Sequence, residues 1–146
     1  MRFPGRYHRK GTPGVWYASL TERGAWAELF RHQLSEELSP FEMRRRVGRV
    51  RVTGLRVLDL TNPAVLAALR LDRQVLVSDD LRHCQAIAEW AEREAYQGIL
   101  APSAALDGEM ILAVFASALG TLTEEHSRVQ RPPRRMAPLV PRIPRA

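Results

Sequence analysis

The chain has 146 residues, of which 45% are apolar and 26% are charged, as expected for one globular domain with one hydrophobic core. Its formal net charge is +6, but six arginines and no acid lie after residue 127, so the other 16 basic residues equal the 16 acidic ones. The chain shows no long apolar run, no signal peptide and no cysteine besides Cys84, which excludes a membrane-spanning protein and an internal disulfide and indicates a cytoplasmic protein.

The first elements expected along the chain are a strand and a helix that follow two turns. Turn-forming residues dominate "GRYHRKGTP" at 5–13, and the β-prone run "GVWYAS" at 14–19 predicts a strand. Ser19 and Glu22 have the spacing of a capping box, and apolar residues at helical spacing continue to about Leu34. A strand followed directly by a helix is therefore expected here.

Two further strands and a short helix are expected in the middle of the chain. The stretch 44–60 alternates arginine and valine with period two, turns at Thr53-Gly54, and then continues as a second strand. We interpret the basic strand as a solvated sheet face that discourages edge pairing. Asn62 suits an N-cap and Pro63 suits the first position of a short helix.

The clearest helix lies in "SDDLRHCQAIAEWAEREAYQG" at 78–98, with Ser78 or Asp79 as its expected cap. Buried strands are expected in "GILAPSA" at 98–104 and at about 110–116, and one more helical turn near 122–125. The order β-α-β-β-α-α-β-β predicts a single mixed α/β, or α+β, domain over residues 1–126.

The last segment, 127–146, is expected to be a disordered or loosely attached tail. It holds the excess arginines and five of the ten prolines, without apolar periodicity. Two interpretations stay open, a solvated extension without a dedicated role and a weak contact with RNA, DNA or an acidic partner.

Four motifs resemble those of the RES domain family, which is named for its Arg, Glu and Ser residues. "GRYH" supplies Arg6, "GTPGVWYAS" supplies Tyr17, "GAWAELFRH" supplies Glu28 and "GILAPSA" supplies Ser103. The steps from Arg6 to Tyr17 and from Tyr17 to Glu28 are each eleven residues, as in the family. The resemblance covers about residues 5–116.

The sequence departs from the family pattern at three places. His8 stands where the family has Asn after the aromatic residue, and Glu109-Met110 stand where an Asn is usual. We also expect this chain to lack the family's additional upstream strand, which carries an arginine.

The resemblance implies a fold similar to that of ADP-ribosyltransferase toxins, with NAD in a cleft between two small sheets. It implies a toxin that cleaves the nicotinamide–ribose bond of NAD, with phosphate or water as acceptor, and a helix-turn-helix antitoxin partner that plugs the cleft. We expect no metal, because the four histidines show no pairing at metal-ligand spacing. A protein ADP-ribosyltransferase and a shortened, inactive binding module stay open as alternatives.

The resemblance also implies roles for five residues. Glu28 would stabilise the positive charge that develops on ribose, and Arg6 would bind the NAD pyrophosphate or an attacking phosphate. Tyr17 would stack on nicotinamide or bond a ribose, Ser103 would bond the nicotinamide amide or ribose, and Tyr7 would line the rim. Four of them also have a structural alternative: an exposed helix residue for Glu28, a surface arginine for Arg6, a core aromatic for Tyr17 and a helix or turn cap for Ser103.

Overall fold

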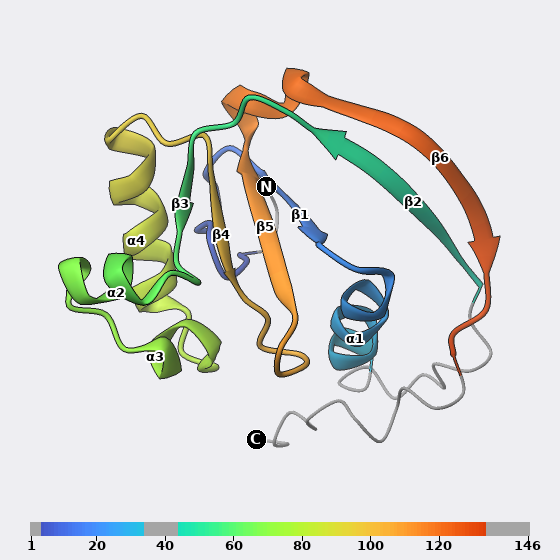
Figure 1. Cartoon of the computed structure of the whole chain (residues 1–146), viewed down its shortest axis with the longest axis horizontal. Coiled ribbons are helices and arrows are strands. Elements are labelled where there is room, and N and C mark those ends of the chain that lie inside the picture. Colours follow the sequence, from blue (N-terminus) through green and yellow to red (C-terminus); the bar gives the residue numbers. More distant parts are fainter. Residues whose placement is uncertain (1–3, 34–43, 134–146) are drawn as a thin grey trace.

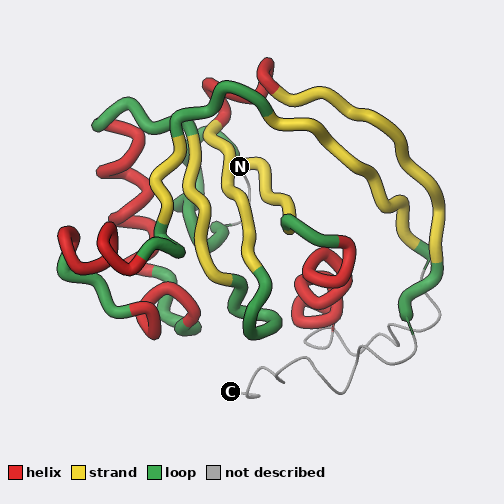
Figure 2. The backbone as a smooth tube through the Cα atoms, in the orientation of Figure 1, coloured by secondary structure: helices red, strands yellow, loops and turns green. Residues whose placement is uncertain are grey.

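The structure is a computed structural model that describes residues 4–33 and 44–133, and a four-stranded sheet forms its centre (Figures 1 and 2). Its strands, in spatial order, are β1 (Val15–Ser19), β5 (Met110–Phe115), β4 (Gly98–Pro102) and β3 (Val57–Asp59). β5 pairs antiparallel with both β1 and β4, whereas β3 runs parallel to β4. The strands expected at 14–19, 57–60, 98–104 and 110–116 are therefore confirmed.

A second sheet consists of β2 (Arg45–Val52) and β6 (Leu122–Gln130), which pair antiparallel along most of their length. Figure 1 shows this pair arching away from the central sheet. The helical turn expected near 122–125 is wrong, because these residues belong to β6 and pair with β2. Residues 127–130, expected in the tail, also belong to β6, and residues 134–146 lie outside the described part. Two small sheets in one mixed α/β domain confirm the expected fold class.

Four α-helices lie in the described part of the chain: α1 (Glu22–Gln33), α2 (Pro63–Leu69), α3 (Arg73–Val77) and α4 (Arg82–Arg93). In Figure 1, α2, α3 and α4 lie on one side of the central sheet, and α1 lies between that sheet and the β2–β6 pair. None of these helices is long and apolar enough to cross a membrane.

The helix starts confirm one expected cap and correct two. Asn62 accepts a hydrogen bond from the N–H of Ala64, as expected for α2. α1 is capped by Thr21, whose Oγ1 accepts from the Gly24 N–H at 3.0 Å, because Ser19 is still paired within the sheet. α4 has no side-chain cap, since its expected caps belong to the preceding turn.

Two clusters of buried side chains hold these elements together. The larger one lies between the central sheet and α3 and α4, and it includes Leu76, Cys84 and Ile99. In the smaller one, Trp26 and Phe30 of α1 are buried with residues of the segment after β4, and Val47 of β2 packs against them. The second cluster fixes α1, which carries Glu28, against both its neighbours.

Candidate active site

The N-terminal turn is tied to β1 through the hydroxyl of Tyr17. This oxygen accepts the backbone N–H of Tyr7 at 2.9 Å and lies 2.9 Å from His8 Nδ1. Burial raises the pKa of Tyr17 to about 12, so the hydroxyl keeps its proton near neutral pH. Gly5 fits the turn because a Cβ there would lie 2.4 Å from the His8 ring.

Arg6 binds the main chain at the end of α3. Its Nη1 donates to the carbonyl oxygens of Leu76 at 3.0 Å and Ser78 at 2.7 Å. The side chain is half-buried and also lines a cavity beside the turn. One nitrogen of the guanidinium therefore holds the turn against the body of the protein.

Tyr7 does not lie at the rim of this cavity, and that expectation is wrong. Its side chain is 1% exposed and belongs to the larger core cluster. Burial raises the pKa of its hydroxyl far above the ordinary value. Neighbouring residues of a tight turn direct their side chains differently, so Arg6 lines the cavity while Tyr7 enters the core.

Glu28 and Ser103, which come from two different motifs, meet across the domain. The hydroxyl of Ser103 donates to Glu28 Oε1 at 2.7 Å, and its oxygen accepts the N–H groups of Ala105 at 3.0 Å and Leu106 at 3.4 Å. Ser103 is only 4% exposed, whereas Glu28 is half-buried and lines the cavity. These contacts fix the Ser103 hydroxyl and direct its proton to the carboxylate.

Two residues that the sequence reasoning missed complete the frame. Arg31 of α1 donates to the carbonyl of Ala104 and forms an ion pair with Asp79 at 2.5 Å. Gln85 of α4 is buried, and its Nε2 donates to the carbonyls of Gly5 at 3.0 Å and His8 at 3.3 Å. A glutamine on the apolar face of a helix indicates a structural hydrogen bond, because buried polar groups need partners. The partners of Gln85 could not be predicted, because they lie far away in sequence.

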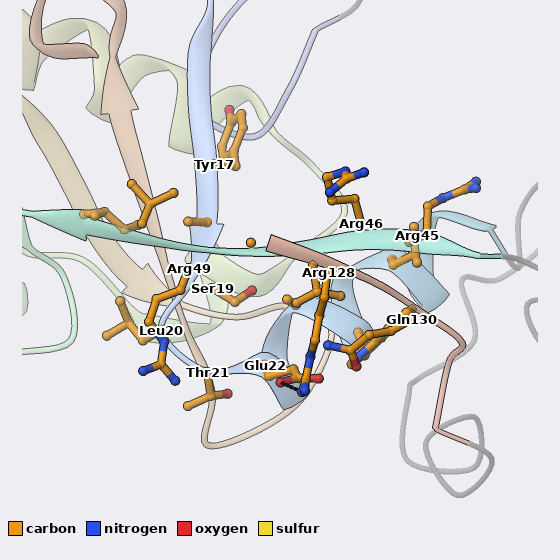
Figure 3. Close-up of a pocket in the computed structure, with 18 of the residues that line it drawn as sticks. Tyr17, Ser19, Leu20, Thr21, Glu22, Arg45, Arg46, Arg49, Arg128 and Gln130 are labelled. Atoms are coloured by element: carbon orange, nitrogen blue, oxygen red, sulfur yellow. Dashed lines mark ion pairs between the residues drawn. The ribbon is translucent and has the colours of Figure 1, made fainter. Parts of the chain in front are cut away.

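The cavity bounded by these residues has a volume of about 780 Å³, within the range of ligand sites. Arg6, Tyr17 and Glu28 all line this cavity. Ser103 does not line it, but contacts the Glu28 carboxylate. A second cavity of about 810 Å³ lies between β1, α1 and the β2–β6 pair, and Figure 3 shows side chains that line it. The two cavities share five lining residues, Tyr17, Ala18, Ser19, Ala25 and Leu29.

Neither a metal centre nor a reactive thiol marks the described residues. No three His, Cys, Asp or Glu side chains within 4–33 and 44–133 gather so that they could hold a metal ion. Cys84 is fully buried in the larger core cluster, and burial raises the pKa of its thiol. It serves as a small packing residue of α4.

Three comparisons with known proteins agree on the family of this chain. The family model described as "RES domain" matches residues 1–135. The chain is 55% identical over 143 residues to the "Probable NAD(+) phosphorylase Rv3189" of Mycobacterium tuberculosis (strain ATCC 25618 / H37Rv), which covers 97% of this chain and 68% of that protein. A chain in the crystal structure of the M. tuberculosis MbcT–MbcA toxin–antitoxin complex matches with a TM-score of 0.78 and 28% identity, over 90% of this chain and 74% of that chain.

Proposed function

This chain belongs to the RES domain family, and from that premise we propose that it is a toxin that degrades NAD. The reaction we propose is cleavage of the bond between nicotinamide and ribose, with phosphate as the acceptor. The relative named above as a probable NAD(+) phosphorylase supports this activity. The observation that carries it is the 2.7 Å contact of Ser103 with Glu28 at the wall of a ligand-sized cavity.

The chemistry assigned to Glu28 follows from the charge that the reaction creates. Nicotinamide leaves with the electron pair of the broken carbon–nitrogen bond, and positive charge develops on the ribose. A carboxylate held near the ribose stabilises that charge in the transition state. A phosphate oxygen then bonds the ribose carbon and its proton passes to solvent, which yields nicotinamide and ADP-ribose 1″-phosphate.

We propose a positioning role for Ser103 instead of contact with the substrate. Its hydroxyl proton already bonds Glu28, and its oxygen accepts two backbone N–H groups. The serine therefore holds one carboxylate oxygen in place, and the half-buried remainder of Glu28 lines the cavity. A serine nucleophile would need a neighbouring base that takes its proton, and a carboxylate that must stay charged for the ribose does not suit that task.

Arg6 and Tyr17 bind the substrate in this proposal. Both line the cavity with Glu28, and Arg6 brings positive charge to it. The hydroxyl of Tyr17 is engaged by the N-terminal turn, which leaves the ring face for stacking on nicotinamide. The turn thus links Arg6 to Tyr17 through the contacts of the Tyr17 hydroxyl with the Tyr7 N–H and with His8 Nδ1.

We also propose an antitoxin protein as partner. The structural relative is part of a toxin–antitoxin complex, and NAD loss would harm a cell that lacked a neutralising protein. A helix-turn-helix part of that antitoxin and a cytoplasmic location stay predictions from the sequence. Weak nucleic-acid contact through the basic segment 127–146 stays a prediction as well.

The experiment that tests the proposal is product analysis of NAD incubated with the purified chain, with and without phosphate. We expect free nicotinamide and ADP-ribose 1″-phosphate, with faster release when phosphate is present. ADP-ribose alone would identify water as the acceptor, and ADP-ribose attached to protein would identify a transferase. No nicotinamide under any condition would support the binding-module alternative and refute NAD cleavage.

A further inference from the structure

The N-terminal turn, residues 5–8, is closed by a bridge between its first and last residues. The Gly5 N–H donates to the His8 carbonyl at 3.0 Å, and the His8 N–H donates to the Gly5 carbonyl at 3.4 Å. Arg6 lies between these two residues and lines the cavity of Glu28. The position of this short turn therefore determines where the Arg6 side chain enters the cavity wall.

Gln85 of α4 holds both ends of the turn at once. Its Nε2 donates to the carbonyl oxygens of Gly5 at 3.0 Å and His8 at 3.3 Å. The side chain is 8% exposed, and a buried amide is costly unless it is hydrogen-bonded. Only the NH2 group of the amide can donate to a carbonyl, so the two bonds fix the orientation of the amide together with the place of the turn.

Gln85 differs from the other contacts of the turn in that it lies away from the cavity. Tyr17 and Arg6 also hold the turn, but both line the cavity and would contact a ligand there. Gln85 does not line the cavity, so it can act on a bound ligand only through other residues. Glu89, one helical turn further along α4, pairs with Arg9 just after the turn, but both side chains are exposed and such a pair contributes little. Gln85 thus supplies a buried link from α4 to the turn.

We infer that Gln85 is a positioning residue, which holds the N-terminal turn so that Arg6 is in place at the cavity wall before a ligand arrives. The consequence for NAD rests on the proposed function. Order that exists before binding does not have to be created by the ligand, which favours affinity. A turn that is correctly placed for only part of the time raises the apparent Kd by the inverse of that fraction.

The first measurement is amide hydrogen exchange of the ligand-free protein, which needs no activity. Gln85→Met keeps the length of the side chain and removes the donor. The matched control is Ile87→Ala, which removes packing of α4 against the larger core cluster at a residue that does not line the cavity. Relative to the amides of the central sheet, the Tyr7 and His8 amides should exchange about tenfold faster in Gln85→Met. The same ratio should stay parental in Ile87→Ala.

The second measurement is the Kd of NAD by titration calorimetry, made in the Glu28→Gln background to slow turnover. We expect Kd to rise about three- to tenfold when Gln85→Met is added and to stay near the starting value with Ile87→Ala. In the chain with Glu28, Gln85→Met should raise KM and leave kcat near the parental value, whereas partial unfolding would lower kcat at unchanged KM. Once Arg6→Ala is present, Gln85→Met should cause no further loss of affinity, because Gln85 acts through Arg6.

Parental exchange of the turn amides in Gln85→Met would overturn the inference. Faster exchange with an unchanged Kd for NAD would overturn it as well, since the turn would then not set the place of Arg6. Losses of affinity that multiply in Arg6→Ala/Gln85→Met would have the same meaning. Gln85→Asn, which shortens the side chain and keeps the amide, is the milder variant to use if Gln85→Met does not fold. A parent that neither binds nor cleaves NAD would remove the proposed function, while faster exchange of the turn in Gln85→Met would still support the positioning role.

Discussion

Replacing Ser103 by alanine tests how Glu28 is held. The change removes the hydroxyl that donates to Glu28 Oε1 at 2.7 Å. A hydrogen bond to a charged group contributes about 1.5–3 kcal/mol, and if all of it is realised in the transition state the rate falls by about ten- to a hundredfold. The same change leaves the buried N–H of Ala105 without its acceptor, which costs about 1–3 kcal/mol of unfolding free energy.

The assay is nicotinamide release at saturating NAD, with the melting temperature as a folding control. Ser117→Ala, an exposed serine, serves as the matched control and should change neither quantity. The decisive measurement is the double variant Glu28→Gln/Ser103→Ala. If Ser103 acts through Glu28, the second change should have no further effect on the rate. Rate losses that multiply in the double variant would show that Ser103 acts on the substrate itself, and the positioning role would be wrong.

Other predictions concern the carboxylate, the N-terminal turn and the end of the chain. Glu28→Gln should leave NAD affinity nearly unchanged and lower the rate of nicotinamide release by about 10²–10³; a folded variant with the parental rate would remove Glu28 from the mechanism. Arg6→Ala should weaken NAD binding in calorimetry, and it should lower the melting temperature because the hydrogen bonds to the Leu76 and Ser78 carbonyls are lost. Arg6→Lys should lose less NAD affinity. Unchanged NAD affinity in Arg6→Ala would contradict the binding role of Arg6. Deleting residues 134–146 should leave the melting temperature and the activity unchanged. Deleting 127–146 should lower both, because it removes the end of β6. Equal melting temperatures for the two truncations would show that the end of β6 adds no stability.

The sequence predicted the central sheet well because its signals are local. The strand at Tyr17 and the helix of Glu28 follow from the turn residues and the apolar spacing around them. The strand before Ser103 is a continuous apolar run ended by proline, which is typical of a buried strand. Arg6, Tyr17 and Glu28 line one cavity, and their roles in NAD cleavage stay predictions.

The elements that the sequence missed depend on distant partners. β6 is almost entirely polar and exposed, so no apolar alternation marks it, and it is a strand because β2 pairs with it. Arg31 and Gln85 act on main-chain carbonyls more than seventy positions away. Tyr7 was misplaced because the direction of a side chain in a tight turn is set by the core around it.

The bond between Ser103 and Glu28 also has a consequence for the timing of activity during synthesis. Its two residues are 75 positions apart, and the bonds from Arg6 to Leu76 and Ser78 span 70 and 72 positions. Contacts of such sequence separation form late, because the chain between them must be closed into a loop first. Translation adds about 5–20 residues per second. Glu28 is therefore synthesised several seconds before Ser103, which fixes its carboxylate. We therefore expect the ribosome-bound chain to stay poorly active until β6 has emerged and paired with β2, and an antitoxin has that interval to be present.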